Sequence, residues 1–347
     1  MHTETELKLF VALQDFDSLV KTLHNLPSST DCKSDFLFNH YFDTCTLQLA
    51  RWDMGLRVRG SKNHQEQTIK TTGSVSSGLH SRPEFNVTTA EKTPNLFLFP
   101  QHIWPLNTDL QYLNNNLNII FETNFTRQTW LININHSTIE VALDKGEVIA
   151  GHKTKLIHEL ELELMKGQNE DLIVLAQLIA NDIPIRLAEE SKAVTGYLLS
   201  GKMSYQFKTA WPNLLDATTA STNTSVPARL KIGLNHWLEL ERYLEHVNNS
   251  VNTKDNEPSV QKDKQAEYAQ FFNQLTHCID TLQDLALTDK KLKSQLTDDE
   301  QITAFIKALL DNPMRIESLW RSTGYGKFQL ALLAYLTRQN CKLFSFN

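Results

Sequence analysis

The first residues of the chain that could perform chemistry are two carboxylates and an amine near its start. In E-T-E-L-K, the charged residues Glu4, Glu6 and Lys8 occupy every second position, with Thr5 and Leu7 between them. Successive side chains of a β-strand point to opposite faces, so the three charges would share one face. The stretch therefore predicts a strand whose charged face is either a solvated surface or part of a site.

The same alternation recurs in six further stretches of the sequence. Their charged positions are Arg57 and Arg59, Glu66 and Lys70, Arg82 and Glu84, Arg127, Glu140 and Asp144, and Glu159, Glu161 and Glu163. A solvated face explains one such strand well, because many sheets have one wet side. Charges on a solubilising surface are usually mixed in sign, however, whereas the like charges here are clustered. The pattern favours a barrel whose charges line a water-filled interior.

Clustered acids and bases inside a barrel suit a divalent metal and a phosphate compound. Mg²⁺ and Mn²⁺ prefer oxygen ligands. Arginine holds phosphate oxygens through two parallel hydrogen bonds, and lysine acts as a point charge. Cleavage of a phosphoanhydride needs in-line attack with the developing charge neutralised, which metals and bases supply together. A P-loop is excluded, because the glycine-flanked stretch at residues 73–78 continues as Leu79-His80 and not as Lys-Ser/Thr.

The composition limits the possible classes of protein. The chain has 347 residues, 41% of them hydrophobic, which is enough for one large or two medium domains. A net charge of −6 provides no general attraction to nucleic acid or to an anionic membrane. The four cysteines have no C-x-x-C spacing, which suits a reducing compartment. No stretch approaches the about 18 apolar residues of a membrane helix, so we expect a cytoplasmic protein.

The sequence changes in character near residue 205. Strand-like runs at short spacing dominate residues 3–163 and favour a barrel over a parallel sheet, with Lys145-Gly146 as a predicted hairpin turn. Helical periodicity dominates the remainder, where 16 basic and 16 acidic residues leave no net charge. We therefore predict a barrel domain at residues 1–203, a linker at 204–228 and a helical domain at 229–347.

Nine motifs in order resemble those of the CYTH superfamily, also called triphosphate tunnel metalloenzymes. They are E-T-E-L-K at 4–8, Y-F-D-T at 41–44, G-L-R-V-R at 55–59, Q-T-I-K-T at 67–71, G-L-H-S-R-P-E-F-N at 78–86, F-T-R at 125–127, I-E-V-A-L-D-K-G-E-V-I-A-G at 139–151, H-E-L-E-L-E-L-M-K-G at 158–167 and E-S-K-A-V-T-G-Y at 190–197. The resemblance covers roughly residues 1–203, and the most similar branch is the bacterial inorganic triphosphatases. It implies an α+β protein with a closed eight-stranded antiparallel β-barrel and flanking helices, followed here by an all-α region.

The resemblance also implies roles for the charged residues. Glu4 and Glu6 would bind a divalent metal, Mg²⁺ or Mn²⁺. The phosphate-binding residues would be Lys8, Arg57, Arg59, Lys70, Arg127 and Lys192. Glu159, Glu161 and Glu163 would bind a second metal or position the attacking water, which makes Glu159, Glu161 and Lys8 the catalytic candidates. Glu84, Glu140 and Asp144 match further tunnel acids.

Several positions have a simpler interpretation or depart from the family pattern. Arg82 and Glu163 could be charges at the rim, and Asp43 could serve only to cap the turn at Asp43-Thr44. Asn86 stands where the family usually has an acid, which would weaken a metal site or alter substrate preference. The helical region is either a divergent or truncated CHAD domain or a lineage-specific helical domain, and because it lacks the H-x-x-R-V-x-x-R run we assign it no polyphosphate binding.

Three functions remain open at the level of the sequence. The first is metal-dependent hydrolysis of inorganic triphosphate to phosphate and pyrophosphate. The second is chemistry on an organic triphosphate: hydrolysis of a nucleotide or of thiamine triphosphate, or cyclisation of ATP. The third is a non-catalytic module that binds triphosphate or polyphosphate. In each case the partner is a small triphosphate and not a nucleic acid or a membrane, and the sequence does not predict an oligomeric state.

Overall fold

The computed structural model describes residues 2–26, 29–30, 32–61, 65–76, 78–205, 207, 224–251, 258–311 and 316–344. The chain divides into two compact units. The barrel unit comprises Met1–Leu13, Val20–Leu172 and Glu189–Ser204, and the helical unit comprises Gln14–Leu19, Ile173–Ala188 and Tyr205–Asn347. Residues 206 and 208–223, most of the predicted linker, lie outside the described residues.

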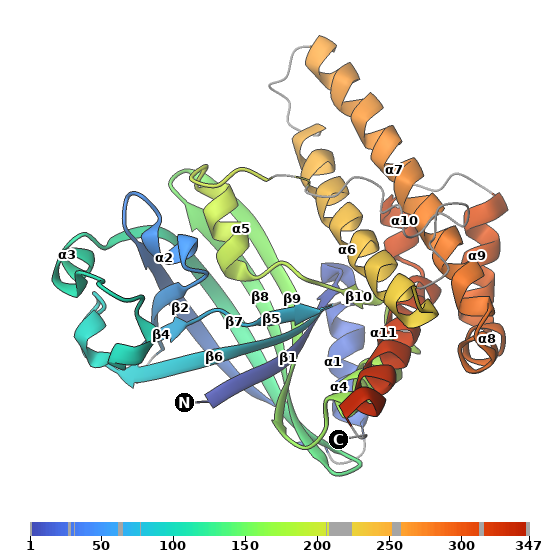
Figure 1. Cartoon of the computed structure of the whole chain (residues 1–347), viewed down its shortest axis with the longest axis horizontal. Coiled ribbons are helices and arrows are strands. Elements are labelled where there is room, and N and C mark those ends of the chain that lie inside the picture. Colours follow the sequence, from blue (N-terminus) through green and yellow to red (C-terminus); the bar gives the residue numbers. More distant parts are fainter. Residues whose placement is uncertain are drawn as a thin grey trace. The chain divides into compact units, whose positions relative to one another are not determined.

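Eight antiparallel strands form a closed barrel (Figure 1). Their order is β1-β9-β8-β7-β2-β3-β4-β6, and β6 pairs back with β1 to close the ring. The strands are β1 (His2–Val11), β2 (Lys33–Asp43), β3 (Gly55–Gly60), β4 (Gln65–Lys70), β6 (Leu79–Thr88), β7 (Asn118–Ile134), β8 (Ser137–Ala150) and β9 (Lys153–Lys166). A short strand, β5 (Ser74–Ser76), adds to β6. The barrel predicted from the strand pattern is confirmed.

Both faces of the β1–β9 pair are buried, one apolar and one charged. Leu9 lies opposite Leu160, and both are fully buried. The alternate position brings Lys8 opposite Glu161, with 7% and 9% of these residues exposed. A strand with one wet face would not bury its charges in this way. The charged face of this pair is therefore enclosed by the barrel, in agreement with the inward-facing charges that the clustering of like charges favoured.

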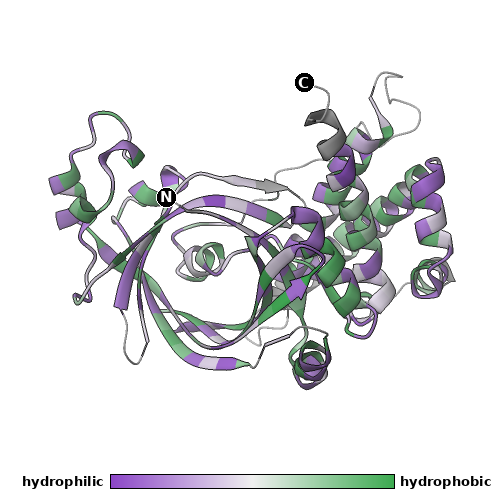
Figure 2. Cartoon of the chain, turned by 90° about the horizontal axis from the view of Figure 1, so that it is seen from below, coloured by the Kyte–Doolittle hydropathy of each residue, from purple (hydrophilic) through white to green (hydrophobic). Residues whose placement is uncertain are grey.

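Short helices accompany the barrel strands. They are η1 (Leu13–Asp15), α1 (Phe16–Asn25), α2 (Gln48–Arg51), η2 (Leu96–Leu98), η3 (Gln101–Ile103), α3 (Leu110–Asn115) and α5 (Lys192–Leu199). Of these, η1 and α1 lie partly in the helical unit, which includes Gln14–Leu19. A hydrophobic cluster that includes Leu49 and Leu96 packs α2 and η2 against strand residues such as Leu56. In Figure 1, α5 lies at one end of the barrel. Figure 2 looks along the ring of strands and shows a helix inside the ring, at the position of α5.

The predicted turn at Lys145-Gly146 is wrong, because β8 passes through it without interruption. Gly146 lies opposite Phe125 on one side and Ile157 on the other, and the chain reverses at Gly151, which has a φ of 60°. A Cβ at Gly146 would clash with the Asn124 carbonyl oxygen and with Phe125. Glycine is present here because another backbone approaches closely.

The helical unit is held by its own buried polar network. Its elements include β10 (Ile185–Leu187), α6 (Val226–Val251), α7 (Pro258–Leu287), α8 (Lys290–Thr297), α9 (Glu300–Asp311), α10 (Ile316–Trp320) and α11 (Thr323–Phe344), and α4 (Asn169–Ala180) contributes its residues from Ile173 onward. Glu241 of α6 accepts hydrogen bonds from Tyr325 and from Gln329 of α11 (3.1 Å). Arg186 of β10 lies 3.5 Å from the same carboxylate. The network joins α6, α11 and β10 through one buried acid.

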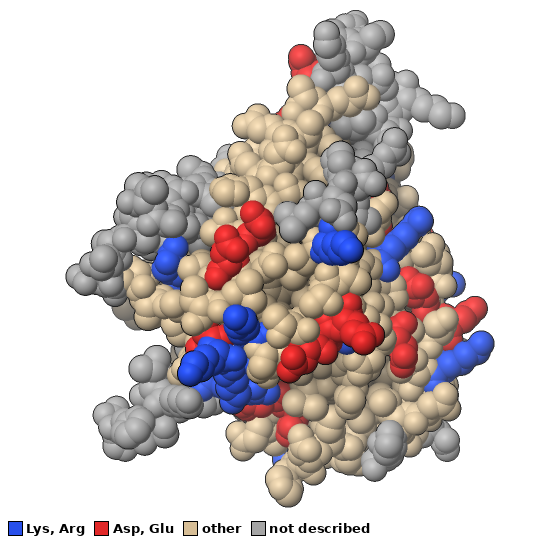
Figure 3. All heavy atoms as spheres, turned by 90° about the vertical axis from the view of Figure 1, so that its right-hand side faces the viewer, with Lys and Arg blue, Asp and Glu red and all other residues tan. Residues whose placement is uncertain are grey.

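The molecular surface is mixed in charge where Figure 3 shows it, with acidic and basic side chains close together. Among the described residues, no helix is long and apolar enough to cross a membrane.

The close approach of the β7 backbone to Gly146 leads to a prediction about the stability of the protein. We expect Gly146→Ala to lower the free energy of unfolding by about 1–3 kcal/mol, because the added methyl group must push the β7 backbone away. Urea denaturation followed by circular dichroism measures the change. Gly151→Asn is the matched control, since a Cβ at Gly151 would meet no atom within 4 Å and asparagine tolerates its left-handed conformation. Equal stability of the two variants would contradict the strand assignment.

Candidate active site

Strand register places charged residues opposite one another on the inner face of the barrel, both as acid–base and as acid–acid pairs. Directly opposed residues in neighbouring antiparallel strands have side chains on the same face, close enough to interact. The opposed pairs are Glu6 with Glu163, Lys8 with Glu161, Arg127 with Asp144, Asp144 with Glu159, Glu140 with Glu163, and Lys70 with Glu84. The pairing therefore joins residues that are far apart in the sequence into one charged surface.

The densest part of this surface surrounds Glu161. Its carboxylate accepts hydrogen bonds from Lys8 (2.5 Å), Arg127 (2.6 Å) and Lys192 (3.0 Å). Asp144 is held by two hydrogen bonds from Arg127, at 2.7 and 2.6 Å, and by Lys192 at 2.8 Å. We call Lys8, Arg127, Asp144, Glu159, Glu161 and Lys192 the Glu161 cluster. Three cations and three carboxylates thus balance one another here.

The charge balance decides which acids of the Glu161 cluster remain ionised. Burial alone would raise the pKa of Glu161, but Lys192, Lys8 and Arg127 together hold that pKa well below its usual range. Burial likewise opposes ionisation of Asp144, and Lys192 and Arg127 outweigh it, so the pKa of Asp144 is lowered. For Glu159, burial outweighs the attraction of Lys192, and the pKa is raised. Glu159 is therefore the acid of this cluster that takes up a proton most readily.

A second group lies around Glu4 on β1. Lys70 donates to Glu4 and lies 3.1 Å from Glu84, which is also 3.7 Å from Arg57. Burial raises the pKa of Glu4 to about 7, with Lys70 opposing the rise and Glu6 and Glu84 adding to it. Burial opposes ionisation of Glu84 too, yet Lys70 and Arg57 hold the pKa of Glu84 far below its usual range. The two acids hydrogen-bond to each other, and of the two Glu4 takes up a proton more readily than Glu84.

Glu6 connects the two groups. Its carboxylate lies 3.0 Å from Lys8, and only 8% of the residue is exposed. Burial would raise the pKa of Glu6, but Lys8 outweighs it and the pKa is lowered, so Glu6 is ionised. Lys8 thus stands between Glu6 and Glu161, and the acids on both sides raise the pKa of Lys8 against the effect of burial.

Arg59 differs from the other predicted phosphate-binding residues. Its Nε donates to Oδ1 of Asn39 at 2.8 Å, and in the described part of the chain no carboxylate forms an ion pair with it. The side chain is partly open to solvent but enclosed by protein on most sides. This enclosure, together with the neighbouring guanidinium groups of Arg57 and Arg127, lowers the pKa of Arg59 to about 10. The barrel therefore contains one place where positive charge is in excess.

The short helix α5 brings Lys192 into the Glu161 cluster. Ser191 caps the helix by accepting from the Val194 N–H (3.3 Å). Near its other end, the Tyr197 hydroxyl donates to Asp43 at 3.0 Å. Asp43 also accepts from the backbone N–H groups of Thr44, Leu49 and Ala50, at 2.7, 2.8 and 3.0 Å. Asp43 therefore does more than cap a turn, because it also anchors the helix that carries Lys192.

One group of acids has the arrangement that a metal ion needs. Asp144, Glu159 and Glu161 each offer a carboxylate oxygen, and these oxygens lie within 4.8 Å of one another. Hard divalent cations take carboxylate oxygens as ligands, so the donor set fits Mg²⁺ or Mn²⁺. The sequence prediction for this site named Glu159 and Glu161 together with Glu163. The structure instead places Asp144 beside the first two, because Asp144 is opposite Glu159 across β8 and β9.

Comparison with known families identifies the barrel. The model of the CYTH domain family matches residues 2–197. The chain belongs to the CYTH domain family. The match spans all eight barrel strands and α5 up to Tyr197, so it contains both the Glu161 cluster and the Glu4 group.

Among curated proteins, an inorganic triphosphatase of Haemophilus influenzae is 37% identical over 213 residues, which cover 61% of this chain and 58% of that protein. The chain thus matches somewhat more than half the length of this relative. Among solved structures, a Hippeastrum protein with a reported dominant triphosphatase activity is 20% identical, with a TM-score of 0.42, over 58% of this chain and 97% of that one. A candidate adenylate cyclase from Bacillus halodurans is 21% identical, with a TM-score of 0.36, over 55% and 96%.

The remaining predicted residues of the CYTH domain lie around the two charged groups. Glu163 faces Glu6 and Glu140 across the strands, outside the close carboxylate group of Glu161. Arg82 pairs with exposed Asp53, which agrees with a position at the rim. Asn86 is exposed and accepts from Thr68 (2.7 Å), and its hydrogen bond to Glu84 favours the ionised form of that acid.

Two contributors to the CYTH site were missed by sequence reasoning, Asn39 and Tyr197. Asn39 lies two residues before Y-F-D-T, and its position on the same strand face as Tyr41 was the available signal. Tyr197 is the last residue of the E-S-K-A-V-T-G-Y motif. Its spacing from Lys192 along the helix did not indicate that Asp43 is its hydrogen-bond partner.

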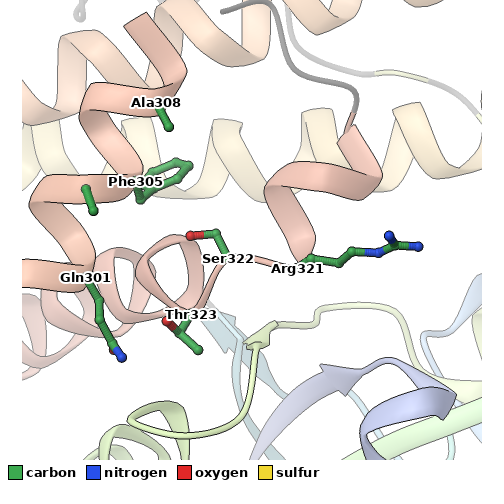
Figure 4. Close-up of a pocket in the computed structure, with 7 residues that line it drawn as sticks. Gln301, Phe305, Ala308, Arg321, Ser322 and Thr323 are labelled. Carbon is green, nitrogen blue, oxygen red and sulfur yellow. The ribbon is translucent and has the colours of Figure 1, made fainter. Parts of the chain in front are cut away.

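The helical unit has a hollow that does not resemble this site. Its lining comes from α9 and from the segment that leads into α11, namely Gln301, Ala304, Phe305, Ala308, Arg321, Ser322 and Thr323. In Figure 4 the Arg321 side chain extends away from Phe305 and Ser322, so these residues do not converge on one point. Its lining includes no carboxylate, in contrast to the CYTH barrel.

The buried position of Glu163 beside other acids leads to a prediction about how stability depends on pH. Burial, Glu140 and Glu6 raise the pKa of Glu163 to about 7, above the ordinary value of 4.5. The folded protein thus holds a proton that the unfolded chain loses, and the associated stability is present below about pH 4.5 and is lost as the pH rises through 7. In EDTA, we expect Glu163→Gln to be more stable than the unchanged protein by about 2 kcal/mol at pH 8, after a discount for partial exposure, and similar to it at pH 5.

Urea denaturation at the two pH values measures this difference. Glu91→Gln, which alters an exposed acid, is the control and should leave the pH dependence unchanged. A difference between Glu163→Gln and the unchanged protein that is equal at pH 5 and pH 8 would contradict the assignment.

Proposed function

We propose that this chain hydrolyses inorganic triphosphate to phosphate and pyrophosphate inside its barrel. The observation that carries the proposal is Arg59, a guanidinium without a carboxylate partner among the described residues, next to Arg57 and Arg127. Three guanidinium groups in one enclosed space repel one another, and an anion with several charges relieves that repulsion. A chain of phosphates meets this requirement better than a single carboxylate does, because arginine binds phosphate oxygens through two hydrogen bonds.

In this proposal six cations bind the substrate. They are Lys8, Arg57, Arg59, Lys70, Arg127 and Lys192. They come from β1, β3, β4, β7 and α5, so they surround the interior instead of lining one wall. A linear triphosphate would therefore be held from several sides, with its terminal phosphorus fixed for in-line attack.

The carboxylates would hold the metal that the family implies. Asp144, Glu159 and Glu161 offer oxygens within 4.8 Å of one another. Glu4 and Glu6 are the second candidate pair. When bound, a divalent ion neutralises charge on the phosphate oxygens and lowers the pKa of a coordinated water. The choice between Mg²⁺ and Mn²⁺ is not made by carboxylate ligands, which suit both.

Water would attack the terminal phosphorus while the bridging P–O bond breaks and pyrophosphate leaves. The attacking water must give up a proton, and an acceptor works best when its pKa lies near the working pH. Burial raises the pKa of Glu159, whereas the pKa of Glu161 is held far below its usual range. We therefore assign the proton to a carboxylate oxygen of Glu159 in addition to its candidate role as a metal ligand, and Glu161, the other shared candidate ligand, also holds Lys8, Arg127 and Lys192 in place.

The inorganic substrate is favoured over an organic one by the relative from Haemophilus influenzae, which is named as an inorganic triphosphatase. We also propose that residues 1–203 form the catalytic domain and that a helical domain at 229–347 follows a linker, since the net charge of −6 lies entirely before residue 205.

Phosphate release from inorganic triphosphate, ATP and thiamine triphosphate tests the function, with Mg²⁺, Mn²⁺ or EDTA present. We expect turnover of inorganic triphosphate that depends on the metal and exceeds turnover of the organic compounds. A preference for ATP or thiamine triphosphate, or conversion of ATP to a cyclic nucleotide, would replace the proposed substrate. Binding of triphosphate without turnover of any compound would identify a non-catalytic binding module.

Glu6→Gln tests the role of the first carboxylates. We expect at least a tenfold loss of kcat/KM, or about 1.4 kcal/mol of barrier, because the amide removes one negative charge from the candidate metal ligands. Glu91→Gln, which alters an exposed acid, should retain full activity. Both variants should show unchanged circular dichroism, and near-normal activity of Glu6→Gln would overturn the metal assignment.

A further inference from the structure

Asn39 is an uncharged residue on the charged inner face of the barrel. It lies in the middle of β2 and is fully buried. Strand register places it opposite Arg59 of β3 on one side and opposite Thr123 of β7 on the other. All three side chains therefore share the inner face of the barrel.

The hydrogen bonds of Asn39 fix the direction of its amide. Its Nδ2 donates to the Thr123 hydroxyl at 3.0 Å and to the Thr123 backbone carbonyl at 3.4 Å. A carbonyl oxygen can only accept, so the nitrogen must face Thr123 and the oxygen must face Arg59. The oxygen then accepts from Arg59 Nε at 2.8 Å. Thr123 thus orients Asn39, and Asn39 orients Arg59.

The hydrogen-bond acceptor at Arg59 is a neutral amide, and Arg59 forms no ion pair among the described residues, whereas each of the other five predicted phosphate-binding cations forms an ion pair with a carboxylate. Lys8 meets Glu6 and Glu161, and Arg127 meets Asp144 and Glu161. The remaining pairs are Arg57 with Glu84, Lys70 with Glu4 and Glu84, and Lys192 with Asp144, Glu159 and Glu161. A carboxylate at position 39 would hold Arg59 equally well but would also cancel its charge.

We propose that Asn39 is a positioning residue that holds Arg59 by a neutral hydrogen bond and so reserves its positive charge for a phosphate group of the substrate. The inference rests on the proposed function, because it supposes that a triphosphate enters the barrel. Nε is the inner nitrogen of the guanidinium, so the bond to Asn39 leaves the two terminal nitrogens available for phosphate oxygens. The Asn39–Thr123 pair thereby selects for a highly charged anion without touching it.

The decisive variant is Asn39→Asp, which has the same shape and adds one negative charge. Calorimetric titration of the full chain with inorganic triphosphate in EDTA measures binding without turnover. We expect the dissociation constant to rise by about tenfold or more, because Arg59 becomes paired with the new carboxylate. Raising the salt concentration should weaken binding less in Asn39→Asp than in the unchanged protein, since one attractive charge has been cancelled.

Two further variants separate positioning from mere structural support. Thr123→Val removes the hydroxyl acceptor with little change of shape, and we expect a smaller rise of about two- to fivefold. In an Arg59→Gln background, Asn39→Asp should have no further effect on the dissociation constant, because it acts through Arg59. Circular dichroism confirms that each variant is folded, and Thr123→Val tests the proposal even where Asn39→Asp does not fold.

The outcomes distinguish this inference from the proposed function. Unchanged triphosphate binding in Asn39→Asp and Thr123→Val, or an equal effect of Asn39→Asp with and without Arg59, would overturn the role of Asn39. Binding of triphosphate by the unchanged protein without hydrolysis in Mg²⁺ or Mn²⁺ would overturn the proposed reaction and leave the role of Asn39 supported if the variants bind as expected. Failure to bind triphosphate in EDTA by a protein that hydrolyses it with Mg²⁺ would overturn the role of Asn39 alone, and failure both to bind and to hydrolyse it with either metal would overturn both.

Discussion

The pairing of opposite charges across the barrel strands is the interaction on which the rest of the site depends. Removing a carboxylate or an ammonium group from water costs several kcal/mol unless an opposite charge replaces the lost solvation. In the Glu161 cluster each acid faces at least one cation, and Glu161 itself faces three. These ion pairs let the barrel enclose many charges and still fold. They also make each member necessary, since loss of one partner leaves the other buried and uncompensated.

This dependence explains why a short helix matters as much as the strands. Lys192 comes from α5 and meets Asp144, Glu159 and Glu161. The helix is held by Tyr197 and Asp43, and Asp43 in turn caps the backbone of α2. The charge balance of the barrel interior therefore depends on the hydrogen bond between Tyr197 and Asp43, which ties α5 to α2 and its preceding turn. The contact is local, but the cluster would lose a cation without it.

Departures from perfect pairing indicate where ligands would enter. Arg59 has a neutral acceptor, and Glu4 and Glu84 share a proton although both are acids. Arg59 thus leaves an excess of positive charge, which suits an anion. Glu4 and Glu84 leave an excess of carboxylate oxygens, which suits a cation. The helical unit differs, because its buried Glu241 is held by a tyrosine, a glutamine and an arginine within one network. That network serves to join helices.

From sequence alone, the short spacing of the strands predicted a barrel, the clustering of like charges at alternate positions favoured an inward-facing charged surface, and the resemblance to the CYTH superfamily implied the closed eight-stranded antiparallel ring. Alternation is a local property, because it follows from the geometry of a single strand. Gly146 was wrongly predicted as a turn, since the same freedom of glycine serves both tight turns and closely approached strands, and only the neighbouring strand distinguishes them. Which charges meet was also beyond the sequence: Lys8 and Glu161 are 153 residues apart, and Asp144 joins Glu159 and Glu161 from a different strand. Register between distant strands and the closure of the ring decide these contacts, and they likewise bring Asn39 between Thr123 and Arg59.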